Sequence, residues 1–156
     1  MTTRGFTLQP ALTHKKRLEE ICQMELAEAE IAYGHERRVL SLLGDLERMG
    51  YEELERQQGQ GQLDITTINI YLYDLQTLQK KIDEQTRILD SLAATVRQKR
   101  EALVGAAKEK KAMEKLKEKH ERELTQALGR TENKLLDEIA TSQFNRRKIG
   151  LEQLVY

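Results

Sequence analysis

A column of apolar residues, each seven positions after the last, runs through the middle of this sequence. A strict seven-residue apolar repeat of this length is typical of a helix in a coiled coil. A second column begins three positions later, at Tyr71, and is interrupted by Gln85 and Lys99. Together the columns predict a long helix–helix contact line, or seam, and leave little room for an enclosed active site. In this half of the chain we expect the seam to contain Ile68, Leu75, Leu78, Ile82, Leu89, Leu92, Val96 and Leu103.

The composition favours long helices over a globular core. Of 156 residues 33% are charged, with no Trp and one Pro, a mixture typical of coiled coils. The formal net charge is zero, so no overall field favours nucleic acid or an anionic membrane. Cys22 has no second cysteine to pair with, which fits a reducing compartment. Because there is neither a run of ~20 apolar residues nor a signal-peptide pattern, we expect a soluble, cytoplasmic protein.

The sequence predicts one all-α coiled-coil domain, residues 1–156, built from two helices. Thr7 is a plausible N-cap for the first helix, and Pro10 is tolerated in its first turn. Asp64 is a favourable N-cap for the second helix, and Gly150 is its natural stop. The expected segments are helix one at about 8–56, a polar turn at about 57–63, helix two at about 65–148 and a C-terminal tail at 149–156.

The two helices are expected to form a long antiparallel coiled-coil hairpin, with the second helix extending beyond the first. A turn near residue 60 places Tyr33 opposite Leu89, and other apolar residues pair in the same way. It also places Glu36 opposite Gln85, and such a polar layer lowers stability but fixes the register. A flipped hairpin or a dimer stays open, because the same seam could pair between chains. From helix one we expect the seam to contain Leu26, Tyr33, Leu40 and Leu43.

The end of helix two carries apolar residues that helix one is too short to cover. From Glu114 to Lys148 the sequence predicts a single projecting helix, and an isolated solvated helix does not need such apolar content. We therefore expect a binding surface for a different partner, with self-association or tolerated exposure as the alternatives. The candidate residues are Leu124, Leu128, Leu135, Leu136 and Ile139.

A second candidate surface lies close to the turn. In the frame of the seam, Ile70, Leu72 and Tyr73 fall outside the contact line, where a two-stranded coiled coil does not cover them. Adjacent exposed apolar and aromatic side chains often mark a binding site. The alternative is that they pack the end of the hairpin against Met49, Tyr51 and Leu54 of helix one.

The sequence contains no recognisable catalytic or metal-binding motif. The three histidines are scattered, and none has a His or Cys four residues on with which to share a metal. The glycine-containing turn lacks the lysine of a phosphate-binding loop. We therefore expect a protein that is not an enzyme and binds no metal or cofactor. The Lys-rich run 108–122 is interrupted by Glu, which favours a solvated helical face or contact with an acidic partner over nucleic acid.

Four segments of the chain, in order, resemble one known family. Its Phe-x-Leu-x-x-x-Leu opening is matched by Phe6, Leu8 and Leu12. Its stretch after the turn is similar to YLYDLQTLQKKIDEQ, and its basic helical segment is similar to KEKKAMEKLKEKHERE. Its C-terminal Leu-Asp-Glu-Ile-Ala run resembles residues 136–140. The family is the FliJ family of flagellar type III export proteins, and the resemblance covers nearly the whole chain.

This resemblance implies a fold similar to the stalk subunit of rotary ATP synthases and a role in flagellum biogenesis, and so in motility and chemotaxis. The implied partners are the hexameric flagellar export ATPase, whose ring assembly and hydrolysis the protein would promote, the export gate membrane protein and the export chaperones. The implied location is the cytoplasmic face of the inner membrane, with peripheral membrane association through these partners only. The alternatives are a coiled-coil spacer or dimeric scaffold, and the equivalent stalk protein of a virulence type III secretion system.

Overall fold

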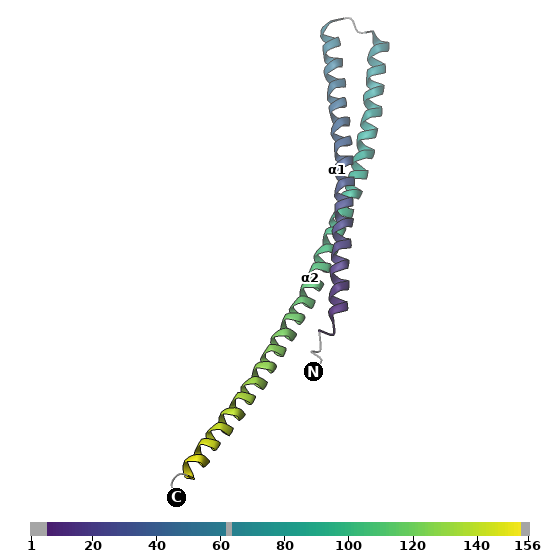
Figure 1. The fold of residues 1–156 in the computed structure, drawn as a ribbon. Coiled ribbons are helices and arrows are strands. Elements are labelled where there is room, and N and C mark those ends of the chain that lie inside the picture. Colours follow the sequence, from purple (N-terminus) through teal and green to yellow (C-terminus); the bar gives the residue numbers. More distant parts are fainter. Residues whose placement is uncertain (1–5, 62–63, 154–156) are drawn as a thin grey trace. The chain divides into compact units, whose positions relative to one another are not determined.

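The structure, a computed structural model, consists of two long helices joined by a short turn (Figure 1). It describes residues 6–61 and 64–153. Helix α1 spans Gln9–Gly59 and helix α2 spans Ile65–Glu152, with 51 and 88 residues. The described residues contain no strand, and the two helices pack against each other. The expected all-α helical hairpin is therefore confirmed.

The helix ends differ from the expected positions by a few residues. Helix α1 begins after a turn in which the amide of Gln9 donates to the carbonyl of Phe6 at 3.0 Å, so Leu8 and not Thr7 precedes its first residue. At its other end α1 continues three residues past the expected Arg56, to Gly59. Helix α2 runs through Gly150 to Glu152, because one glycine inside a helix costs only about 1 kcal/mol.

The turn begins with a glycine in a left-handed conformation. Gly61 has φ +66°, which a residue with a Cβ adopts only at a cost. The amide of Gly61 donates to the carbonyl of Gln58 at 3.3 Å, and this bond closes the end of α1. Asp64 stands directly before α2, and its carbonyl accepts from the amide of Ile68 at 3.1 Å. Residues 62 and 63 of the expected turn lie outside the described residues.

The chain divides into two compact units. One is Arg17–Lys108, and the other combines Met1–Lys16 with Glu109–Tyr156. In the first unit the two helices lie side by side and run in opposite directions (Figure 1). Ion pairs cross between them at 2.9 Å, from Lys99 to Glu25, and at 3.1 Å, from Arg100 to Glu30. All the residues named above for the seam are buried or half-buried.

The two helices of the first unit pack closely near the turn, at Gly50. A Cβ added there would lie 2.8 Å from Cδ2 of Leu75, a side chain that is only 6% exposed. This is nearly 1 Å inside the optimal separation of two carbon atoms. The glycine therefore lets the two helices approach at this point, beside the buried Leu54.

In the second unit, the start of α1 covers a short stretch of α2. Leu12 is 1% exposed, the lowest value among the described residues. Nζ of Lys15 lies 2.6 Å from Oε2 of Glu109 and lowers the pKa of that carboxyl. The rings of Phe6 and His120 are in contact, with their centroids 5.8 Å apart. These contacts fix residues 6–16 against α2 between Glu109 and His120.

Candidate partner-binding surfaces

The last third of α2 is exposed along its whole length. From Glu121 to Leu151 every residue is exposed except the half-buried Gly129. Four apolar residues in this stretch follow each other at steps of four, seven and four, so they share one face of the helix. Their exposed fractions run from 36% at the first to 59% at the third. We call this face the α2 stripe: Leu124, Leu128, Leu135 and Ile139.

The structure does not place the fifth candidate residue of this region on the same face. Leu136 directly follows Leu135, and successive residues of an α-helix are separated by about 100° around the axis. Its side chain is exposed, but it points away from the α2 stripe. Four of the five sequence-predicted residues therefore form one continuous surface.

The α2 stripe begins directly after a series of ion pairs on the same helix. Arg122 lies 3.5 Å from Glu118, and Lys119 lies 3.9 Å from Glu123. These pairs are spaced by four residues and exposed, so they support a solvated helix and contribute little to stability. These charged side chains keep this part of α2 solvated although its apolar stripe is exposed.

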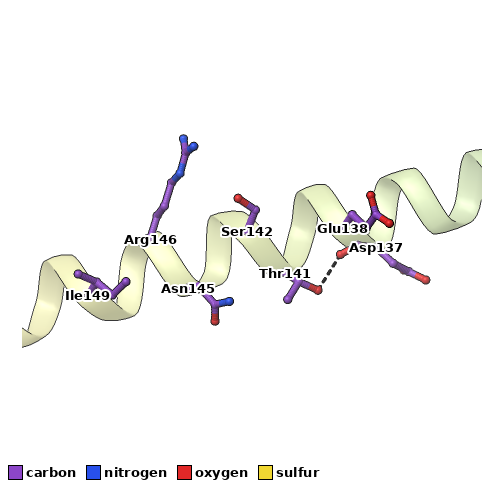
Figure 2. A pocket seen from close by; sticks show the side chains of 7 residues that line it. All are labelled: Asp137, Glu138, Thr141, Ser142, Asn145, Arg146 and Ile149. Carbon is purple, nitrogen blue, oxygen red and sulfur yellow. Dashed lines mark hydrogen bonds between the residues drawn. The ribbon is translucent and has the colours of Figure 1, made fainter.

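Near the end of the α2 stripe, a shallow hollow begins and runs further along the same helix (Figure 2). All the residues that line it lie between Asp137 and Ile149. Thr141 donates to the carbonyl of Asp137 at 2.7 Å, so its hydroxyl is already engaged by its own helix. A hollow formed by a single helix has no opposite wall, and it does not enclose a small molecule.

The candidate residues near the turn are exposed but do not form a single patch. Ile70 and Tyr73 are three positions apart and lie on neighbouring parts of one face, and Tyr73 is 69% exposed. Leu72 is also exposed, but it lies about 100° around the helix from Tyr73. The end of the hairpin is packed by other residues, Leu54 and Leu75, which are buried.

A hydrogen-bonded cluster of polar side chains holds the end of the hairpin. Arg56 donates to the carboxylate of Glu53 at 2.9 and 2.6 Å, and Gln57 donates to it at 2.7 Å. These bonds lower the pKa of Glu53 to about 2 and raise the pKa of Arg56. Gln57 also donates to the Tyr71 hydroxyl at 3.1 Å. The cluster joins α1 to α2 close to the exposed Ile70 and Tyr73.

The expected polar layer in the middle of the hairpin is present. Gln85 is buried, and its amide donates to the carbonyl of Glu36 at 3.1 Å and to the carboxylate of the same residue. The bond from Gln85, and after it the bond from His35, lowers the pKa of Glu36. Because the buried amide is satisfied only in this register, the layer opposes sliding of one helix along the other.

The comparison with protein families decides which family this chain belongs to. The profile described as flagellar FliJ protein matches residues 4–148.

The chain belongs to the FliJ family.

It is therefore a component of the flagellar type III export apparatus, in a family whose members are non-catalytic. Comparisons with curated proteins and with solved structures gave no match.

In this FliJ-family chain, the part that the structure describes holds no cluster of three His, Cys, Asp or Glu side chains able to bind a metal ion. Within residues 6–61 and 64–153, neither helix is long and apolar enough to cross a membrane.

Sequence reasoning missed one further surface of this FliJ-family chain. Helix α1 exposes several large apolar residues outside the seam. One of them, Leu46, also lines a hollow that it shares with Leu75 and Leu78 of α2. These exposed residues of α1 follow each other at steps of three, seven, eleven, four and three residues, and a regular spacing of three and four appears only when Glu28, His35 and Val39 are included. The seven-residue columns of helix two predicted only the face of α1 that packs in the seam. The exposed residues are Ile21, Met24, Ile31, Leu42, Leu46 and Met49.

Proposed function

We propose that this chain binds the hexameric flagellar export ATPase through the α2 stripe and promotes its ring assembly and hydrolysis. The observation that carries this proposal is an apolar face that stays open on a long helix, in a chain from a family of flagellar export components. Such a face is costly to leave in water and is typical of a partner site.

The geometry of the α2 stripe suits insertion of a helix between walls formed by another protein. Anchors at steps of four, seven and four lie in one line, as in complexes where an amphipathic helix occupies a hydrophobic groove. Full burial of a Leu or Ile side chain contributes about 1.5–3 kcal/mol, and these side chains are already partly covered. Four of them together supply roughly 4 kcal/mol before the costs of association. A ring that encloses the helix would add contacts on its other faces.

In this proposal the chain also contacts the export gate membrane protein and the export chaperones, which places it at the cytoplasmic face of the inner membrane. The exposed Ile70, Tyr73 and Leu72 are the residues we propose for one of these contacts. They lie in the unit Arg17–Lys108, whereas the α2 stripe lies in the other unit. Separate surfaces would allow the chain to hold the ATPase and a second component together. The chain itself performs no catalysis in this proposal and needs no cofactor.

The test is the rate of ATP hydrolysis by the export ATPase, at concentrations where its ring is partly assembled. The wild-type chain should give a saturable increase. The double variant Leu135→Asp, Ile139→Asp should remove most of this increase, because carboxylates would replace the apolar contacts.

The matched control is Phe144→Asp, Leu151→Asp. It adds the same charge to exposed apolar positions of α2 that lie on the opposite side from the stripe. The control should keep the stimulation. Equal loss in both double variants, or full stimulation by the stripe variant, would contradict the proposed role of the α2 stripe. No stimulation by the wild-type chain would contradict the proposed function.

A further inference from the structure

Helix α1 carries an open apolar face that the proposed function does not use. We call it the α1 stripe. Six of its apolar side chains are between 50% (Ile21) and 70% (Ile31) exposed, and the seventh, Val39, is half-buried. They lie within the unit Arg17–Lys108, on a helix that already contributes one face to the seam. A helix with two apolar faces is typical of a position between two neighbours.

The spacing of the residues in the α1 stripe is symmetric about the centre of the stripe. Starting at Arg17 and ending at Glu53, steps of four and three residues follow in an order that is symmetric about His35. The 36 positions between these ends correspond to about ten turns at 3.6 residues per turn, so the face runs straight along the helix. The positions in order are Arg17, Ile21, Met24, Glu28, Ile31, His35, Val39, Leu42, Leu46, Met49 and Glu53.

We propose that the α1 stripe pairs with the α1 stripe of a second copy of this chain, in antiparallel orientation, about a two-fold axis at His35. A two-fold interface brings each pair of residues together twice. In this register three pairs of apolar residues face each other on each side of the axis. The pairs are Ile21 with Met49 of the second copy, Met24 with Leu46 and Ile31 with Val39.

The charges at the two ends favour this arrangement over a parallel one. In the antiparallel register Arg17 faces Glu53 of the second copy, and this pair occurs at both ends. A parallel dimer would instead place arginine against arginine and glutamate against glutamate. Arg56 and Gln57 keep Glu53 ionised. Arg17 makes no hydrogen bond or ion pair among the described residues, so it is available to such a partner.

The centre of the stripe limits the strength of the association. Glu28 would face Leu42 of the second copy, and a carboxylate against an apolar side chain is unfavourable. His35 would meet its own copy at the axis. We therefore expect a reversible dimer that forms as the concentration rises. This inference does not rest on the proposed function, since it concerns other residues on another helix.

The first test is a disulfide at the two-fold axis. His35→Cys in a Cys22→Ser background places one thiol of each copy at the axis. Helices packed about 8–10 Å apart bring facing Cα atoms to within about 4–6 Å, which a disulfide can span. Mild oxidation should give covalent dimers. Ser41→Cys in the same background is the control, because Ser41 is exposed on α1 but lies off the stripe. It should remain monomeric. Equal crosslinking of both variants would overturn the proposal.

The second test is sedimentation equilibrium over a range of concentrations. The wild-type chain should dimerise reversibly. Ile31→Glu should raise the dissociation constant at least about tenfold, because two unpaired carboxylates would enter the interface. Ile88→Glu places the same charge at an exposed isoleucine of α2 in the same unit and should leave dimerisation unchanged. A wild-type chain that stays monomeric throughout, or dimers unaffected by Ile31→Glu, would overturn the proposal.

Discussion

The close approach of the helices at Gly50 predicts an unusual response to a common stabilising substitution. Replacing glycine by alanine inside a helix usually raises the free energy of unfolding by about 1 kcal/mol. At Gly50 the new Cβ would lie 2.8 Å from Cδ2 of Leu75. Leu75 is buried and must move, and overpacking of this kind costs about 1–3 kcal/mol. We therefore expect Gly50→Ala to be neutral or to destabilise the protein by up to about 2 kcal/mol.

The same substitution should act differently when Leu75 is shortened. Leu75→Ala alone removes three carbon atoms, worth about 2.5 kcal/mol at roughly 0.8 kcal/mol each. In that background nothing blocks the Cβ at position 50, and Gly50→Ala should recover about 1 kcal/mol. The two substitutions should thus be coupled by about 1–3 kcal/mol, as expected for residues in direct contact.

Urea unfolding followed by far-UV circular dichroism measures these free energies. The comparison requires that the m value, the slope of the unfolding free energy against urea concentration, is the same in all variants. Gly44→Ala is the control, because no atom lies within 4 Å of a Cβ added at this exposed helical position. It should stabilise the protein by about 1 kcal/mol. If Gly50→Ala stabilised the wild-type chain as much as Gly44→Ala does, the argument from close approach would be refuted.

Three further results are expected. Leu89→Ala should lower the free energy of unfolding by about 2–3 kcal/mol, because Leu89 is half-buried between the helices. Tyr73 is largely exposed, so Tyr73→Ala should lower it by less than about 0.5 kcal/mol. Urea unfolding measures both changes. The carboxyl of Glu53 has a folded-state pKa of about 2, below the ordinary 4.5, so its contribution is complete above pH 4.5 and is lost as the pH falls towards 2. Thermal melts across this range should show a smaller loss of stability in Glu53→Gln. Leu12→Ala should cost about 3 kcal/mol, and faster amide exchange in residues 6–16 would show that they detach from α2.

The fold was predictable because a seven-residue apolar repeat has few other solutions. Its columns required a partner helix, and the polar turn favoured a partner in the same chain but left pairing between chains open. The ion pairs from Lys99 to Glu25 and from Arg100 to Glu30 show that the helices pair within one chain. The polar layer of Glu36 and Gln85 followed from the register alone. The helix ends were less predictable, because Gly150 costs a helix little and the residues around it, Lys148 and Leu151, are good helix formers. A single glycine therefore did not end α2.

The candidate surfaces were predictable as leftover apolar residues, but their arrangement around the helix was not used. Leu72 and Leu136 were grouped with their neighbours by hydrophobicity, although each lies about 100° from the residue beside it in the sequence. The α1 stripe was missed for a related reason. Glu28 and His35 interrupt its apolar residues, so only a comparison of both ends with the centre reveals the symmetry.

Helix α2 is one continuous helix, but we expect its two ends to differ in local stability. From Ile65 to Lys108 its backbone is supported by side chains that pack on α1, so its amides should exchange with deuterium slowly. From Glu121 to Leu151 every residue except Gly129 is exposed, and only the helix's own hydrogen bonds and a few exposed ion pairs oppose local opening. A gradient of exchange rates should therefore run along a single continuous helix. A partner that binds the far end must order it, and that entropy cost would keep the complex reversible.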